Sequence, residues 1–128
     1  MMFNHVMIGT NDLEKSRAFY DAALGALGYQ NSGGGGALLN YRDGESGFVI
    51  RAPRNGEPAT FANGGTIGFR AGSTSEVDAF HAAGLAQGGT NDGAPGLREG
   101  SYGSPYIAYL RDPDGNKICA MWKKSWEG

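Results

Sequence analysis

The N-terminal residues alternate between two faces of an extended chain. Phe3, His5 and Met7 share one face, and Val6 and Ile8 share the other. A period of two residues is typical of a β-strand, so the pattern predicts a strand at the start of the chain.

Helical spacing follows this strand. Asn11 or Asp12 offers a side-chain oxygen that can cap a helix, and glycines at 25 and 28 mark its end. The apolar positions of the predicted helix are Leu13, Phe19, Tyr20, Ala23, Leu24 and Leu27. Three short strands are then predicted around Tyr29, over 37–42 and over 47–52, because glycine-rich turns separate these segments.

The same order of elements begins again in the second half of the chain. A strand is predicted over 65–71, and Ser73 and Glu76 then form a capping box that starts a second helix. Phe80 occupies the place in this helix that Phe19 occupies in the first. Residues 93–103 are predicted to be irregular, and the remaining strands are predicted over 106–111 and 117–122, joined by a turn at 112–115.

This repetition predicts an α+β fold of two βαβββ modules. Module one spans about residues 1–60 and module two about residues 61–128, within a single domain 1–128. Each helix covers one face of its module's sheet, so we expect a curved mixed sheet that forms a cup, with the helices outside. The cup is the expected ligand site.

Composition and charge narrow the class of protein. Glycine occurs 23 times in 128 residues, and Gly9 and Gly68 inside the predicted first strands are expected to bend the sheet or leave room for a ligand. The net charge of −2 gives no basic surface for nucleic acid or for an anionic membrane. A single cysteine, Cys119, and the lack of an N-terminal signal pattern or a long apolar run predict a cytoplasmic protein.

Two motifs at opposite ends of the chain resemble those of the vicinal oxygen chelate superfamily, which includes glyoxalase I, bleomycin-resistance proteins and extradiol dioxygenases. The first motif is His5-Val6-Met7-Ile8-Gly9-Thr10-Asn11-Asp12-Leu13-Glu14-Lys15-Ser16, followed by Phe19-Tyr20. The second is Tyr109-Leu110-Arg111-Asp112-Pro113-Asp114-Gly115-Asn116-Lys117-Ile118-Cys119. Together they span nearly the whole chain and are specific for the fold, but not for the reaction.

The resemblance also implies where a metal would bind. The family's ligand positions match His5, Thr66 and Cys119, and a less certain alignment adds Arg51. Only His5 is a clear ligand, because a hydroxyl is a poor donor for these ions and an inward-pointing guanidinium repels a cation. We therefore expect no metal or other cofactor, and a weak divalent site that uses His5 and Cys119 remains the alternative.

The residues expected to line the ligand pocket come from the first and last strands of the two modules. They are His5, Met7, Arg51, Thr66, Arg70, Tyr109, Cys119 and Met121. His5 is the best candidate for an acid or base, and Tyr109 matches an active-site tyrosine of extradiol members. The plainer alternatives are a hydrogen-bonded His5 without chemistry, a buried apolar Cys119 and solvated arginines at 51 and 70. Residues 93–103, with Arg98 and Tyr102, form either a rim over the ligand or a surface loop.

These observations favour a small-molecule-binding protein with a degenerate metal site that acts as a homodimer. It would hold its ligand in the sheet cup and would have no nucleic-acid or membrane partner. The alternative is a metal-dependent lyase, isomerase or dioxygenase of the same superfamily. Glyoxalase I activity itself is not expected, because Thr66 and Cys119 occupy metal-ligand positions. Pairing of the modules within one chain and pairing between two chains both remain open.

Overall fold

The computed structural model describes residues 2–33, 35–100 and 103–127. These segments contain two helices and seven strands, and a short 3₁₀ turn follows the last strand. In chain order the elements are β1 (His5–Gly9), α1 (Leu13–Gly25), β2 (Leu38–Asp43), β3 (Ser46–Arg51), β4 (Ile67–Arg70), α2 (Thr74–Ala86), β5 (Thr90–Leu97), β6 (Tyr106–Arg111), β7 (Lys117–Trp122) and the turn Lys124–Glu127.

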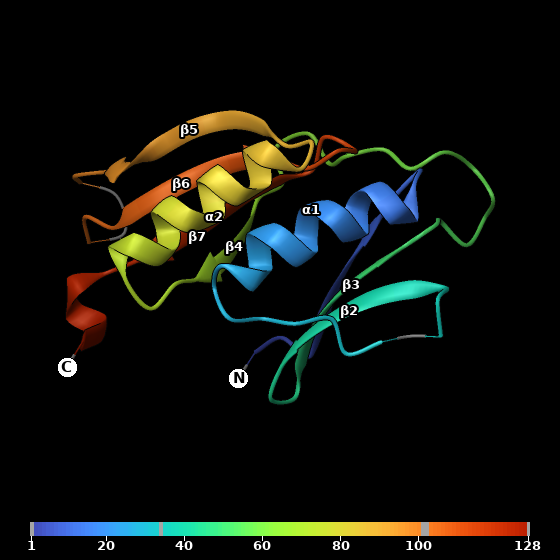
Figure 1. Ribbon diagram of the computed structural model, residues 1–128, viewed down its shortest axis with the longest axis horizontal. Helices are drawn as coiled ribbons and strands as arrows, with labels where there is room; N and C mark the ends of the chain where they lie inside the picture. Colours follow the sequence, from blue (N-terminus) through green and yellow to red (C-terminus); the bar gives the residue numbers. More distant parts are fainter. Residues whose placement is uncertain (1, 34, 101–102, 128) are drawn as a thin grey trace.

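The strands form two mixed sheets, one for each module. Module one has the order β1-β3-β2 and module two the order β4-β7-β6-β5. In both sheets the first strand pairs in parallel with the last strand, and the remaining pairs are antiparallel. Figure 1 shows the two sheets at an angle to each other behind the helices. The predicted α+β fold of two βαβββ modules is therefore confirmed, with two separate sheets in place of one continuous sheet.

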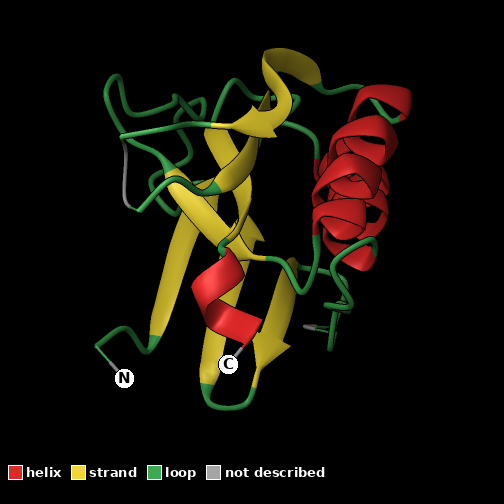
Figure 2. Cartoon of the chain, turned by 90° about the vertical axis from the view of Figure 1, so that its left-hand side faces the viewer, coloured by secondary structure: helices red, strands yellow, loops and turns green. Residues whose placement is uncertain are grey.

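Both helices cover the same side of the sheets, where they lie next to each other (Figures 1 and 2). Each begins at a side-chain cap, since Asp12 accepts a hydrogen bond from the backbone of Lys15, and Ser73 accepts one from the backbone of Glu76. The ring of Phe19 in α1 fits against α2 because Gly84 has no side chain there. Apolar residues of both modules form one buried cluster, in which Phe48 of β3 and Phe69 of β4 meet edge to face at 5.0 Å.

Two predicted segments differ from the structure. The strand expected around Tyr29 is reduced to a single bridge between Asn31 and Tyr41. The segment 93–103, expected to be irregular, overlaps the second half of β5, which pairs with β6 through register shifts at Gly93 and before Gly96. Such bulges let a glycine-rich chain join a sheet whose neighbour supplies the register, so local sequence alone indicated a loop.

The connection over 52–66, which we call the strap, runs from module one to module two. A side chain at Gly9 would stand 3.0 Å from Cβ of Ala59 and 3.3 Å from Cγ of Pro53, so the bare backbone of β1 is what lets the strap cross it. Asn11 fixes the strap further, because its amide donates to the carbonyl of Ala59 at 3.1 Å and accepts from the Ala59 N–H at 2.7 Å. The room at Gly9 is thus used by the chain itself.

The two sequence motifs contact each other at the start of α1. Oδ2 of Asp114 accepts hydrogen bonds from the hydroxyls of Thr10 at 2.6 Å and Ser16 at 3.3 Å, and its Oδ1 accepts from the backbone of Asn11 at 2.9 Å. Gly115 adopts a φ of 90° in this turn, a conformation that favours glycine. The closing turn therefore holds the second module onto the first.

Candidate functional site

A cavity of about 250 Å³ opens at the seam between the two modules. We call it the seam cavity. Its apolar wall includes Val6, Phe48, Ile67 and Phe69, with Leu24 of α1 behind them. Ligand pockets are usually lined mainly by apolar and aromatic side chains with a few polar groups, and at this volume the seam cavity suits a molecule smaller than a typical drug.

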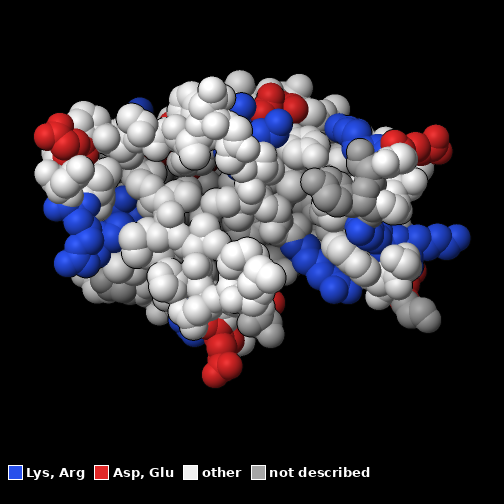
Figure 3. Space-filling model, turned by 180° about the vertical axis from the view of Figure 1, so that it is seen from behind, with Lys and Arg blue, Asp and Glu red and all other residues white. Residues whose placement is uncertain are grey.

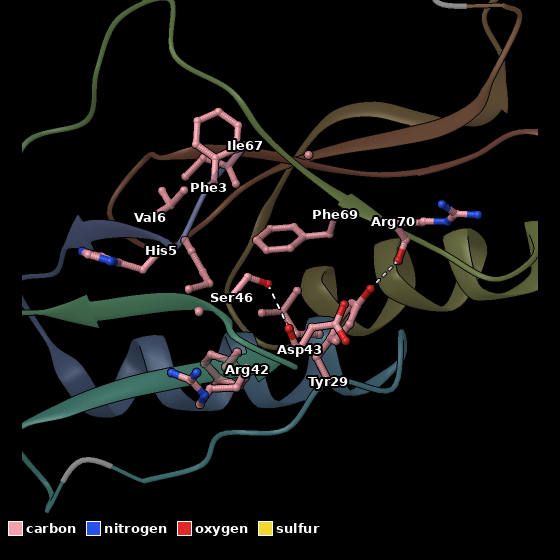
Figure 4. Close-up of a pocket in the computed structure, with 15 residues that line it drawn as sticks. Phe3, His5, Val6, Tyr29, Arg42, Asp43, Ser46, Ile67, Phe69 and Arg70 are labelled. Carbon is pink, nitrogen blue, oxygen red and sulfur yellow. Dashed lines mark hydrogen bonds between the residues drawn. The ribbon is translucent and has the colours of Figure 1, made fainter. Parts of the chain in front are cut away.

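Polar groups surround this apolar wall in Figure 4. Ser46 and Asp43 lie below Phe69 in that view, and the Ser46 hydroxyl donates to the Asp43 carbonyl at 3.0 Å. The Tyr29 hydroxyl donates to the carbonyl of Arg70 at 3.0 Å. Burial, followed by the negative charge of Asp43, raises the pKa of Tyr29, so its hydroxyl stays protonated at neutral pH.

His5 and Arg70 are the two predicted pocket residues that line the seam cavity. Nδ1 of His5 lies 2.8 Å from Oδ1 of Asn4. The guanidinium of Arg70 points away from the cavity in Figure 4 and stacks over the ring of Trp126 at 4.2 Å. Thr66 is exposed just before β4 and does not line the seam cavity.

Met7 and Arg51 line a different cavity, of about 390 Å³, at the other end of β1. Its remaining wall comes largely from the strap, including Pro53 and Ala59. The structure thus divides the predicted residues of module one between two cavities, with His5 in one and Met7 and Arg51 in the other.

Tyr109, Cys119 and Met121 lie on the outer face of module two, the face away from the helices. Tyr109 pairs with Cys119 across β6 and β7, and the ammonium group of Lys117 lies 4.8 Å from the Tyr109 ring. Cys119 is buried, and burial raises the pKa of its thiol to about 11 although nearby Lys117 lowers it. Cβ at Gly68 would stand 3.3 Å from the Cys119 sulfur, so this glycine too makes room for the protein's own side chain.

The outer face is uncharged over most of its centre, as Figure 3 shows, and its Lys and Arg side chains gather toward the edges. Two apolar side chains remain well exposed near the β1 edge, Phe3 with 66% and Met7 with 48% of its surface open to solvent. Arg98 on the far side is held by a 2.8 Å hydrogen bond from its guanidinium to the Ala94 carbonyl. Tyr102 lies outside the described residues.

The residues that the sequence did not indicate are mostly in β2 and β3. Arg42, Ser46 and Gly47 line the seam cavity, and Gly47 pairs with His5 on one side and Arg42 on the other. These residues join His5 because the first and last strands of module one pair in parallel, which places Gly47 next to His5. Recognising it requires the strand register, which the sequence pattern alone does not give.

Across residues 2–33, 35–100 and 103–127, no helix is long and apolar enough to cross a membrane. Within that same part of the chain, no three His, Cys, Asp or Glu side chains are grouped so that they could hold a metal ion. His81 of α2 is buried, and its Nε2 lies 2.9 Å from Oδ1 of Asn91.

The structure belongs to the class of folds that are built from two βαβββ modules, with a cavity at the seam between them. Comparisons with known proteins support this class. The model of the Glyoxalase/Bleomycin resistance protein/Dioxygenase superfamily matches residues 2–120, so the chain belongs to this superfamily. The lactoylglutathione lyase of Haemophilus influenzae is 32% identical over 98% of this chain and 95% of its own length.

Solved structures extend the likeness to the fold. A glyoxalase/bleomycin resistance protein from Albidiferax ferrireducens shares 53% identity, with a TM-score of 0.91 over 96% of this chain and 100% of that chain. A glyoxalase-related enzyme from Fulvimarina pelagi has 17% identity and a TM-score of 0.77 over 96% of this chain and 88% of that chain, which shows a common fold.

Proposed function

We propose that the protein binds a small organic molecule in the seam cavity and that it does so without a metal ion. The observation that carries this proposal is the apolar cavity between the modules, walled by Phe48 and Phe69 and bordered by the polar groups of His5, Ser46 and Tyr29. The sequence placed the ligand in a cup on the face of the sheets away from the helices. The seam cavity lies between the modules instead, and its lining includes Leu24 of α1 as well as His5.

The chemistry of the family's ligand positions supports a degenerate metal site. Thr66 offers only a neutral hydroxyl, and in the described part of the chain neither His5 nor Cys119 belongs to a group of three His, Cys, Asp or Glu side chains that could hold an ion. Metal ions bind the thiolate and bind neutral hydroxyls poorly. The residues at these positions therefore do not fit a divalent ion, and no step is assigned to one.

We further propose that the protein is a cytoplasmic homodimer. Exposed Phe3 and Met7 lie on or beside the edge strand β1, whose outer side has no strand partner in the described sheet. Apolar side chains at an open sheet edge are typical of a surface that another chain covers. Light scattering is expected to give twice the mass of the 13.4 kDa chain, and a monomer at micromolar concentration would contradict this.

Binding is tested with a panel of small aromatic compounds, as matched acid and amide pairs, measured by ligand-observed NMR. Ile67 lines the seam cavity, so Ile67→Trp is expected to fill it and abolish binding. Leu97→Trp is the matched control, because Leu97 lies on edge strand β5 with 61% of its surface exposed. Thermal melting verifies that both variants fold. The proposal fails if no compound binds the wild type, or if Ile67→Trp binds as well as Leu97→Trp.

A second candidate function is a metal-dependent lyase, isomerase or dioxygenase. The specific observation in its favour is the 32% identity to the Haemophilus influenzae lactoylglutathione lyase. It is tested by assaying lactoylglutathione lyase activity and thermal stability with added Zn²⁺, Ni²⁺ or Mn²⁺. We expect neither turnover nor a shift in melting temperature; stoichiometric metal binding would overturn the degenerate-site proposal.

A further inference from the structure

The strap contains two Asn-Gly pairs, Asn55-Gly56 and Asn63-Gly64. All four residues are exposed, and the two glycines adopt φ values of 78° and 98°, a conformation that makes this pair common in tight turns. Asparagine is also a thermolabile residue. Its side-chain amide is attacked by the backbone nitrogen of the next residue, and a glycine at that position has no side chain to obstruct the approach. Both pairs are therefore candidates for chemical modification.

The modification converts asparagine to an acid, with water as the co-reactant. At the second pair, the nitrogen of Gly64 gives up its proton and bonds to Cγ of Asn63, and the side-chain nitrogen leaves as ammonia. The product is a cyclic imide between the two residues. Water then adds to one of its carbonyls and opens the ring. Aspartate forms when the new bond from the nitrogen to Cγ breaks, and isoaspartate forms when the original peptide bond breaks, with no change of oxidation state in either case.

Neither reacting group of Asn63-Gly64 is held by the protein. The Asn63 amide and the Gly64 N–H form no hydrogen bond with any of the residues that the structure describes. Their turn is closed by a 3.1 Å bond from the N–H of Gly65 to the carbonyl of Ala62, which engages neither the attacking nitrogen nor the attacked carbon. The side chain and the nitrogen can therefore rotate into contact without losing a hydrogen bond of their own.

The pair Asn55-Gly56 has the same chemistry but is restrained. The N–H of Gly56 donates to the carbonyl of Pro53 at 3.2 Å, and Oδ1 of Asn55 accepts from the N–H of Glu57 at 2.9 Å. The Gly56 nitrogen must break its hydrogen bond before it can attack, and the Asn55 side chain is held toward Glu57. The same motif is therefore protected in one turn of the strap and unprotected in the other.

We propose that Asn63 is a modification site, at which the folded protein converts spontaneously to aspartate and isoaspartate while Asn55 is protected. The site lies between two fixed points. Before it, Phe61 packs against the closing turn, since a Cβ at Gly115 would stand only 2.8 Å from its Cδ1, and after it β4 begins at Ile67. Isoaspartate adds a methylene group to the main chain between these points, and both products add a negative charge. The modification therefore alters the link between the modules and does not depend on a ligand in the seam cavity.

The test incubates the full-length protein at mildly alkaline pH, and tandem mass spectrometry assigns the mass change to either asparagine in the same sample. Asn63 is expected to convert about fivefold faster than Asn55, which corresponds to roughly 1 kcal/mol for the hydrogen bond that Gly56 must break. The control is the same protein unfolded in urea, where the two rates should come together because glycine follows both asparagines. The inference is overturned if Asn63 converts no faster than Asn55 in the folded protein, or if the ratio of rates is the same in urea.

Two variants test the route through the Gly64 nitrogen. Gly64→Ala places a methyl group beside that nitrogen and is expected to slow conversion at Asn63 severalfold. Gly56→Ala is the matched control, because it also adds a methyl group at a positive φ with nothing within 4 Å, yet should leave the Asn63 rate unchanged. Thermal melting verifies that both variants fold. Unslowed conversion at Asn63 in Gly64→Ala would show that this nitrogen is not the attacking group, and the proposal would then be overturned.

Discussion

The hydroxyl of Tyr20 in α1 donates a 2.6 Å hydrogen bond to Oδ2 of Asp112, a residue that lies 92 positions further along the chain. Both residues are buried. Burial, and then the negative charge of Asp112, raise the pKa of Tyr20, while burial raises the pKa of Asp112 despite the hydrogen bonds from Tyr20 and Asn116 that lower it. The two sequence motifs are therefore joined by a buried bond between their most enclosed polar groups.

Removing this hydroxyl should destabilise the protein. Tyr20→Phe leaves Asp112 short of one donor in the core, which is expected to lower the free energy of unfolding by about 1–3 kcal/mol. Tyr29→Phe is the control, because its 3.0 Å bond to the Arg70 carbonyl is exposed and its loss should cost less than about 1 kcal/mol. Urea denaturation measures both. An equal loss of unfolding free energy in the two variants would show that the Tyr20 hydrogen bond stabilises the protein no more than the exposed Tyr29 bond does.

Filling the space at Gly9 should displace the strap. Gly9→Val places methyl groups where Ala59 and Pro53 already lie, so a loss of about 1–3 kcal/mol is expected from overpacking. Gly25→Ala is the matched control, since nothing lies within 4 Å of its Cβ position at the end of α1. That change should be neutral or slightly stabilising in a thermal melt. A neutral Gly9→Val would mean that the strap moves aside freely.

Asn11 should control how firmly the strap is held. Asn11→Ala removes both hydrogen bonds to Ala59, and we expect faster hydrogen exchange across residues 52–66 with little change in the strands. Asn55→Ala removes only a local bond to the backbone of Glu57, so exchange should change there alone. Exchange in the strap that matches the wild type would instead indicate that packing at Gly9 suffices to hold it.

The buried thiol of Cys119 predicts a pH dependence. Burial raises its pKa in the folded state to about 11, above the ordinary thiol pKa of 9.0, so the folded protein keeps the thiol proton that the unfolded chain loses. Stability from this group is complete below pH 9 and is lost as the pH rises through 11, by about 3 kcal/mol in total. The comparison is with Cys119→Ala: the difference in unfolding free energy between the two proteins should shrink over this interval. A constant difference would contradict burial of the thiol.

How much the sequence predicted depends on the range of the interactions involved. The spacing of the apolar residues and the N-terminal capping residues located both helices. Asp12 and Ser73 cap through backbone N–H groups only three positions away, which is a local interaction. β5 was missed because its glycines gain order only from pairing with β6. The site was predicted partly, through His5, because Gly47 and Arg42 join it through strand register, a relation between distant segments. Gly9 was expected to bend the sheet or to leave room for a ligand; in the structure the strap crosses it, and Gly9 also lines the cavity between β1 and the strap.

The contact between the two motifs also determines when the first module can form all of its hydrogen bonds as the chain is synthesised. Thr10, Ser16 and Tyr20 leave the ribosome early, whereas Asp112 and Asp114, which satisfy their hydroxyls, are made close to the end of the chain. Until then Thr10 and Ser16 have only their local hydrogen bonds, and Tyr20 lacks its carboxylate partner, because contacts of such long sequence separation form late in folding. The first module therefore completes its core only after nearly all of the second has been translated.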